Sequence, residues 1–238
     1  SLLSLSSSDH PHIQSIVKQL VEEFKDKGVS IALPSLRAKL CVGEFSEIFA
    51  KMRKTSLTFA PEAGSERLRR LIQKNIDITE LCDVARQAYG AGYRLLKLYF
   101  MIGLPTETEH DLDEIAALCQ KVSLLKKEVN GSVAQLNVSI SNFVPKPHTP
   151  FQWEGMASVE DIAAKQTYLK KQLNKMRGSI HLKFHDARTS FIEAVLSRGD
   201  SRLSAVIQKV FCQGGRFDAW SQMFNFSLWS EAFMQCGL

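Results

Sequence analysis

Five short groups of polar, glycine and proline residues follow apolar runs along the chain, and their side chains suit the binding of a small polar ligand. Serine, arginine and glutamate contact hydroxyl, amino and carboxylate groups, and glycine lets a ligand approach the backbone closely. Each group alone is also what an ordinary turn contains. Together they predict a binding rim. The groups are residues 6–9, 34–37, 60–65, 102–105 and 143–148.

The apolar runs that precede these groups alternate with amphipathic segments. This alternation predicts parallel strands with helices outside them, and the spacing between strand starts suits βαβ units. Periodicity leaves open whether the strands form a doubly wound sheet or part of a (β/α) barrel, but in both folds chemistry belongs at the carboxyl ends of the strands. We expect strands at 2–5, 29–33, 56–59, 95–101, 133–143 and 180–184, and helices at 13–24, 45–52, 65–71, 79–89, from 108 onward and at 158–176.

The alternation stops near Arg188. Two short helices are expected at 189–196 and 203–212, followed by a segment rich in phenylalanine and tryptophan from Phe217 to Phe233. Stacked aromatic rings can bind nucleic-acid bases, but no basic residues are interleaved with these rings. A small packed aromatic core is therefore the better interpretation.

The composition is that of an ordinary globular protein. With 238 residues, 45% of them hydrophobic and 23% charged, the chain suits one large α/β domain with a short appendage. It has no run of about 18 apolar residues, so we expect no membrane span. The net charge of +5 is spread along the chain, and its most basic part, between Lys165 and Lys183, keeps a nucleic-acid contact open as an alternative.

The cysteines are dispersed and form no compact metal-binding motif. An odd number without a signal peptide favours free thiols in a reducing compartment, so we expect a cytoplasmic protein. The chain also lacks a P-loop, a dinucleotide-binding glycine pattern and a nucleophile elbow, which removes the main support for a triphosphatase or a serine hydrolase. The five thiols are those of Cys41, Cys82, Cys119, Cys212 and Cys236.

Three stretches together resemble the radical S-adenosylmethionine (SAM) enzymes. They are residues 57–69 (LTFAPEAGSERLR), 97–109 (KLYFMIGLPTETE) and 143–153 (FVPKPHTPFQW), the third being the most specific. The resemblance covers residues 1–185 and is strongest to an uncharacterised group that often carries a cobalamin-binding domain. It implies a partial (β/α) TIM-type barrel over 1–185 and a helical C-terminal extension over 186–238.

The resemblance also implies a reaction. Family members hold a 4Fe–4S cluster on a C-x-x-x-C-x-x-C motif, reduce SAM with it and start radical chemistry on a substrate. This motif is absent here, and residues 1–6 resemble the end of the second barrel strand, so the cluster ligands are expected upstream. We therefore expect a fragment of an iron–sulfur oxidoreductase or transferase, inactive without the upstream part that completes its barrel. Its cofactors would be SAM, the cluster and, in the cobalamin-linked group, cobalamin.

The same resemblance assigns residues to the SAM site. Backbone atoms near Ser6 and Ser7 would meet the amino group, Ser35 and Arg37 the ribose or the carboxylate, Glu62 the bound SAM or substrate, and Lys74 the methionine carboxylate. An adenine pocket would be lined by Met101, Ile102, Gly103, Phe143, Val144 and Pro145.

The substrate is left open between RNA and a small molecule. The alternative function is a module that binds a nucleotide or RNA without chemistry. Steep loss of affinity with rising salt would distinguish RNA binding through phosphates.

Overall fold

The computed structural model of the chain describes residues 10–24, 26–27, 29, 56–74, 76–176 and 179–238. The predicted strand at 2–5, the helix at 45–52 and all but the first residue of the strand at 29–33 lie outside these ranges. The same holds for the predicted site residues Ser6, Ser7, Ser35 and Arg37, and for Cys41.

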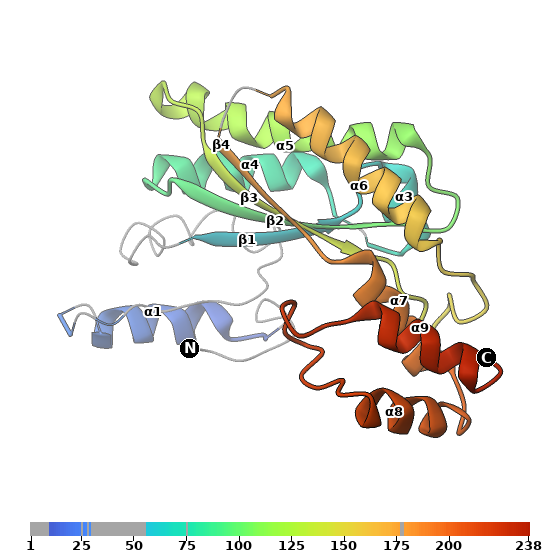
Figure 1. The fold of residues 1–238 in the computed structure, drawn as a ribbon. Helices are drawn as coiled ribbons and strands as arrows, with labels where there is room; N and C mark the ends of the chain where they lie inside the picture. Colours follow the sequence, from blue (N-terminus) through green and yellow to red (C-terminus); the bar gives the residue numbers. More distant parts are fainter. Residues whose placement is uncertain (1–9, 25, 28, 30–55, 75, 177–178) are drawn as a thin grey trace. The chain divides into compact units, whose positions relative to one another are not determined.

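The described structure contains a parallel four-stranded sheet (Figure 1). Its strands are β1 (Leu57–Glu62), β2 (Leu95–Ile102), β3 (Gln135–Asn142) and β4 (Ser179–Phe184), and their order in the sheet is β1-β2-β3-β4. Strands that neighbour one another in both sequence and sheet are connected through helices, as right-handed βαβ units require. The predicted α/β fold of parallel strands, consistent with a partial TIM-type barrel, is confirmed.

The helices between the strands begin and end where the local sequence predicts. Ser65 caps α3 (Glu66–Leu71) by accepting a hydrogen bond from the N–H of Leu68, and Asp77 caps α4 (Ile78–Gly90) in the same way through Thr79. Gly131, with a φ of 78°, ends α5 (Glu109–Asn130). Two further helices are α1 (Ile13–Phe24), before β1, and α6 (Val159–Asn174), between β3 and β4.

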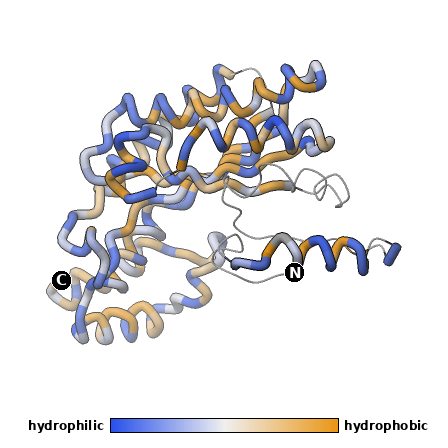
Figure 2. Tube along the Cα trace, turned by 180° about the vertical axis from the view of Figure 1, so that it is seen from behind, coloured by the Kyte–Doolittle hydropathy of each residue, from blue (hydrophilic) through white to orange (hydrophobic). Residues whose placement is uncertain are grey.

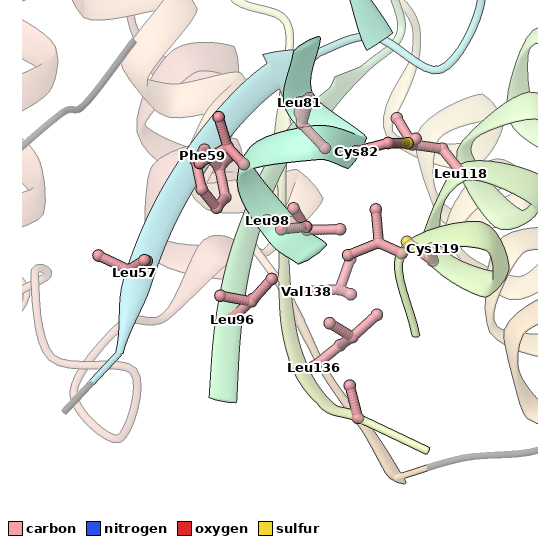
Figure 3. Packing of buried hydrophobic residues seen from close by; sticks show 14 of the residues in the cluster. Leu57, Phe59, Leu81, Cys82, Leu96, Leu98, Leu118, Cys119, Leu136 and Val138 are labelled. Carbon is pink, nitrogen blue, oxygen red and sulfur yellow. The ribbon is translucent and has the colours of Figure 1, made fainter. Parts of the chain in front are cut away.

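The main core lies between one face of the sheet and the helices. Alternate residues of each strand point to this face, as the two-residue period of a strand requires. Figure 3 shows these strand side chains meeting side chains of α4 and α5, and Figure 2 shows hydrophobic residues concentrated on the strands, while the helices alternate between hydrophobic and hydrophilic positions. The labelled members of this core are Leu57, Phe59, Leu81, Cys82, Leu96, Leu98, Leu118, Cys119, Leu136 and Val138.

The chain divides into two compact units. The first holds the described residues up to Ile102, together with Thr106–Ser141 and Lys165–Phe184. The second holds Gly103–Pro105, Asn142–Ala164 and His185–Leu238, and it contains α7 (Ala187–Arg198), α8 (Leu203–Cys212) and α9 (Phe226–Gln235). The domain boundary expected after residue 185 stays a prediction.

The second unit has an aromatic core of its own, as expected. Trp229 is buried against α7 and α8, with Phe226 and Phe233 packed beside it. Phe217 and Trp220 differ from the expectation, because they remain 72% and 68% exposed. No helix in the part of the chain that the structure describes is long and apolar enough to cross a membrane.

Candidate functional site

Glu62 ends β1 at the carboxyl edge of the sheet, where parallel-sheet proteins place their chemistry. The pairing of β1 with β2 is irregular between Phe59 and Glu62, and Glu62 has a φ of 68°. A residue other than glycine in this left-handed region costs about 1–3 kcal/mol, and such residues cluster at binding and active sites. The backbone at Glu62 is therefore held in an unfavourable conformation by its surroundings.

The side chain of Glu62 forms an ion pair with Lys74, which follows α3. The Nζ atom of Lys74 lies 3.2 Å from Oε1 of Glu62, and the side chains are 39% and 29% exposed. Both residues were predicted site residues, and the structure brings them into direct contact. A carboxylate and an ammonium side by side, each still open to solvent, present the charges that a zwitterionic ligand needs: Glu62 for its ammonium group and Lys74 for its carboxylate.

A buried arginine fixes the turn that follows Glu62. Arg69 is 6% exposed, and its guanidinium donates hydrogen bonds to the backbone carbonyls of Ala63 and Gly64. Burial lowers the pKa of Arg69, although the charges of Glu66 and other acids oppose this. Gly64 packs so closely on α5 that a Cβ atom would lie 2.2 Å from the backbone nitrogen of Ile115. Only glycine fits there.

Asp111 joins the start of α5 to the start of α3. Its carboxylate is 2% exposed and accepts hydrogen bonds from the Ser65 hydroxyl (2.5 Å), the Thr108 N–H and hydroxyl (both 2.8 Å) and the Arg67 guanidinium (2.5 Å). Burial alone would raise the pKa of Asp111, but these four donors outweigh it and hold the pKa at about 2. The carboxylate is therefore ionised at neutral pH.

Most of these contacts could not be read from the sequence. The spacing of Thr108 and Asp111 predicted a capping box, which is confirmed. Nothing in the spacing indicated that the same carboxylate also binds Ser65 and Arg67, more than 40 residues earlier. The signal available was an arginine-rich short helix, residues 66–71, next to a glycine.

The end of β2 supplies the other described residues of the predicted adenine pocket in the first unit. Ile102 is fully buried in the main core, whereas Met101 is half-buried and, by the alternation of the strand, points to the opposite face. Gly103 follows with a φ of 81°, which explains why glycine occupies this position. Within the second unit, a Cβ atom at Gly103 would meet only side chains, those of Ala157 and Ile162.

The remaining predicted pocket residues lie in the second unit. Phe143 is buried and packs edge-to-face against Phe151, with ring centroids 5.6 Å apart. Pro145 is buried and Val144 is half-buried. The segment is anchored by Asn142, whose side-chain amide donates to the hydroxyl of Ser190 at 2.9 Å.

The described cysteines do not suit an iron–sulfur cluster. Cys82 and Cys119 lie in the main core (Figure 3), and burial raises the pKa of both thiols, that of Cys119 to about 12. Cluster ligands are thiolates, which such pKa values oppose. Cys212 and Cys236 belong to the second unit. No group of three or more His, Cys, Asp or Glu side chains in the described ranges could hold a metal ion.

Comparison with known proteins agrees with the resemblance seen in the sequence. Residues 2–119 match the sequence model of the radical SAM superfamily. The chain is also 35% identical, over 209 residues, to an uncharacterised protein of Methanocaldococcus jannaschii. That alignment covers 86% of this chain but 42% of the relative, so the chain spans less than half of the relative's length. Glu62, Lys74 and the end of β2 all fall within the superfamily match.

Proposed function

Because residues 2–119 belong to the radical SAM superfamily, we propose that the chain is part of an enzyme that cleaves SAM reductively to start radical chemistry on a second substrate. When bound, SAM would supply this chemistry: uptake of one electron would break its bond between sulfur and C5′ to give methionine and a 5′-deoxyadenosyl radical, which would take a hydrogen atom from the substrate. The observation that carries the proposal is the Glu62–Lys74 pair at the carboxyl edge of the sheet, inside the matched region.

The pair suits the methionine end of SAM in charge. Its ammonium group would donate a hydrogen bond to Glu62, and its carboxylate would accept one from Lys74. Separating the two side chains costs little, because a half-exposed ion pair contributes only about 0–1 kcal/mol. When the ligand binds, Glu62 exchanges the ammonium group of Lys74 for that of SAM, and Lys74 exchanges the carboxylate of Glu62 for that of SAM. The strained backbone of Glu62, held by Arg69 and Gly64, keeps the carboxylate in place before binding.

The adenine end of SAM would lie against apolar surface. Within the proposal, Met101 contributes from the end of β2 in the first unit. The roles that the resemblance implies for Gly103, Phe143, Val144 and Pro145, which lie in the second unit, stay predictions. Ile102 contributes through its backbone, because its side chain is buried in the core.

The reaction needs an electron donor for SAM, which the residues of the proposed SAM site do not supply. Since the described cysteines do not fit a 4Fe–4S cluster, we place the cluster ligands in the upstream part of the protein, as the resemblance implies. Cobalamin as a second cofactor, a redox or transfer outcome, and a cytoplasmic location belong to the same proposal and rest on the resemblance.

The first test uses the full-length protein, reconstituted anaerobically with iron and sulfide. We expect about four irons per chain and formation of 5′-deoxyadenosine that requires both SAM and a reductant. Liquid chromatography with mass spectrometry measures the nucleoside. If the protein holds the iron but forms no 5′-deoxyadenosine, the proposed reaction is wrong.

The second test examines the site. Glu62→Gln and Lys74→Met each remove one charge-assisted hydrogen bond, worth about 1.5–3 kcal/mol, so the dissociation constant for SAM should rise about 10- to 100-fold. Equilibrium dialysis measures it. Glu66→Gln is the matched control, because it breaks an exposed ion pair between Glu66 and Arg70 within the neighbouring helix α3. If all three variants bind SAM with equal affinity, Glu62 and Lys74 are not part of the SAM site.

A second candidate is RNA binding without chemistry. The exposed Lys170 and Lys171 on α6 favour it, although the basic stretch is less continuous than expected, because Lys165 pairs with Glu107 and Lys183 lies on β4. This function predicts that affinity for RNA falls steeply with salt while no SAM is consumed.

A further inference from the structure

The face of the sheet opposite the main core carries polar and cationic side chains. Because side chains alternate along a strand, each strand contributes residues to this second face, which we call the open face. On β2, for example, Leu96 and Leu98 are fully buried, whereas Tyr99 between Leu98 and Phe100 is 43% exposed. The polar members of the open face in the middle of the strands are Thr58, Lys97, Tyr99, Asn137, Ser139, His181 and Lys183.

The register of the strands arranges these residues in two rows across the sheet. Asn137 pairs with His181 and Ser139 with Lys183. The N–H of Gln135 donates to the carbonyl of Arg94, and in a parallel pair this bond aligns Gln135 with the residue after Arg94. One row is therefore Thr58, Lys97, Asn137 and His181, and the other, nearer the carboxyl edge, is Tyr99, Ser139 and Lys183.

The open face has positive charge that the described residues leave unpaired. The side chains of Lys97 and Lys183 have no hydrogen-bond or ion-pair partner among the described residues, and neither do the side chains of the other members of the two rows. Within the four strands, the sole carboxylate is that of Glu62, and it is paired with Lys74. Two ammonium groups, an imidazole, a phenol, an amide and two hydroxyl groups thus face the same way.

We propose that the open face binds a small molecule that carries an oxyanion, a carboxylate or a phosphate, and that this molecule is the one on which the radical chemistry acts. The proposal rests on the proposed function for the second of these statements. Lys97 and Lys183 neutralise the oxyanion, and Tyr99, Asn137 and Ser139 donate hydrogen bonds to its oxygen atoms. The row of Tyr99 lies two residues, about 7 Å, before Met101 along β2, so the ligand lies close to the carboxyl edge.

The size of the rows favours a small molecule over a polymer. Strands in a sheet lie about 4.8 Å apart, so Tyr99 and Lys183, two strands apart, span about 10 Å. Lys97 and Lys183 lie in different rows, also two strands apart but two residues apart along the strands, so about 12 Å separates their positions on the sheet. Two lysines across that distance match one or two oxyanions. A nucleic acid would need a longer track of cations.

The test measures binding by isothermal titration calorimetry to the full-length, reconstituted protein, with inorganic phosphate and glutarate as separate probes and sodium chloride as the reference anion. Lys97→Met and Lys183→Met remove one cation each. Lys127→Met, on the exposed surface of α5, is the matched control for loss of a lysine. We expect at least one probe to bind the unchanged protein and the control equally, and at least tenfold more weakly to each of the other two variants, which corresponds to about 1.4 kcal/mol.

Tighter binding of phosphate identifies a phosphate-bearing ligand, and tighter binding of glutarate identifies a carboxylate-bearing one. Equal affinities in all four proteins, or binding of neither probe, would overturn the proposal. Cleavage of SAM by the unchanged protein is measured separately. Anion binding without SAM cleavage would support the anion site and refute the proposed function. SAM cleavage without anion binding would support the proposed function and refute the anion site.

Discussion

Replacing Asp111 with asparagine should destabilise the fold through the loss of one buried charge. The carboxylate joins the starts of α3 and α5 and accepts hydrogen bonds from Ser65, Thr108 and Arg67. Asparagine has the same shape, but it has one acceptor oxygen where aspartate has two. Its amide nitrogen would face donors, and Arg67 would lose its ion pair.

The magnitude follows from the pKa of Asp111. Its fall from an ordinary value of 3.8 to about 2 corresponds to about 2 kcal/mol of stability at neutral pH. Because the side chain of Asp111 is buried, solvent does not weaken its electrostatic interactions. The unsatisfied donors left by asparagine add to the loss. We therefore expect Asp111→Asn to lower the free energy of unfolding by about 2–4 kcal/mol at pH 7.

The pH dependence has a definite sign. The pKa is lower in the folded than in the unfolded protein, so the contribution is complete above about pH 4 and is lost as the pH falls toward 2. Urea unfolding of both proteins between pH 7 and pH 3 should show the difference between them narrowing at the acid end. Asp113→Asn is the control, because Asp113 is exposed and accepts one hydrogen bond from Tyr168. A difference that does not change with pH would refute the argument that an ionised carboxylate stabilises this junction.

Two further changes test the packing around the sheet. Gly64→Ala should lower the free energy of unfolding by about 2 kcal/mol or more in a thermal-unfolding measurement, because the new Cβ atom would overlap the backbone of Ile115. Gly90→Ala is the control and should leave the free energy of unfolding unchanged, because its Cβ atom would meet nothing within 4 Å. Equal effects of the two changes would contradict the close approach of Gly64 to α5. In the native protein at pH 8, Cys119 should resist a thiol reagent, because burial raises its pKa to about 12, while the exposed Cys212 reacts; peptide mapping that finds Cys119 labelled as fast as Cys212 would show the core to be open.

The periodicity of the sequence was enough to predict the described strands and most of the described helices closely, but α9 was expected only as part of an aromatic segment. Strand β2, for example, was expected at 95–101 and runs from Leu95 to Ile102. Capping residues made the helix starts predictable, as at Ser65 and Thr108. These features are local: they depend on residues within four positions of one another, whose side-chain chemistry alone sets the backbone conformation.

The contacts that build the candidate site are not local, and they could not be read from spacing. The pair of Glu62 and Lys74 was predicted as two separate roles through the resemblance, and its direct contact depends on how α3 turns back to the end of β1. The two rows of the open face depend on the register of the strands. A shift of one residue in the register of a strand would move its side chains to the other face of the sheet. Lys97 and Lys183 were therefore not recognisable as members of one surface.

The way the turn after Glu62 is held argues that its conformation serves a function. A left-handed backbone at Glu62 is unfavourable, and a glycine or asparagine there would relieve the strain. Instead the chain keeps a carboxylate at this position and surrounds it with costly support: the buried guanidinium of Arg69 holds the next two carbonyls, and Gly64 allows α5 to pack against the turn. Ala63 and Gly64 are themselves buried, so the guanidinium also satisfies two carbonyl groups that would otherwise lack a donor. The same contacts hold the Glu62 carboxylate beside Lys74, and a zwitterionic ligand binds best to two charges that are already in place.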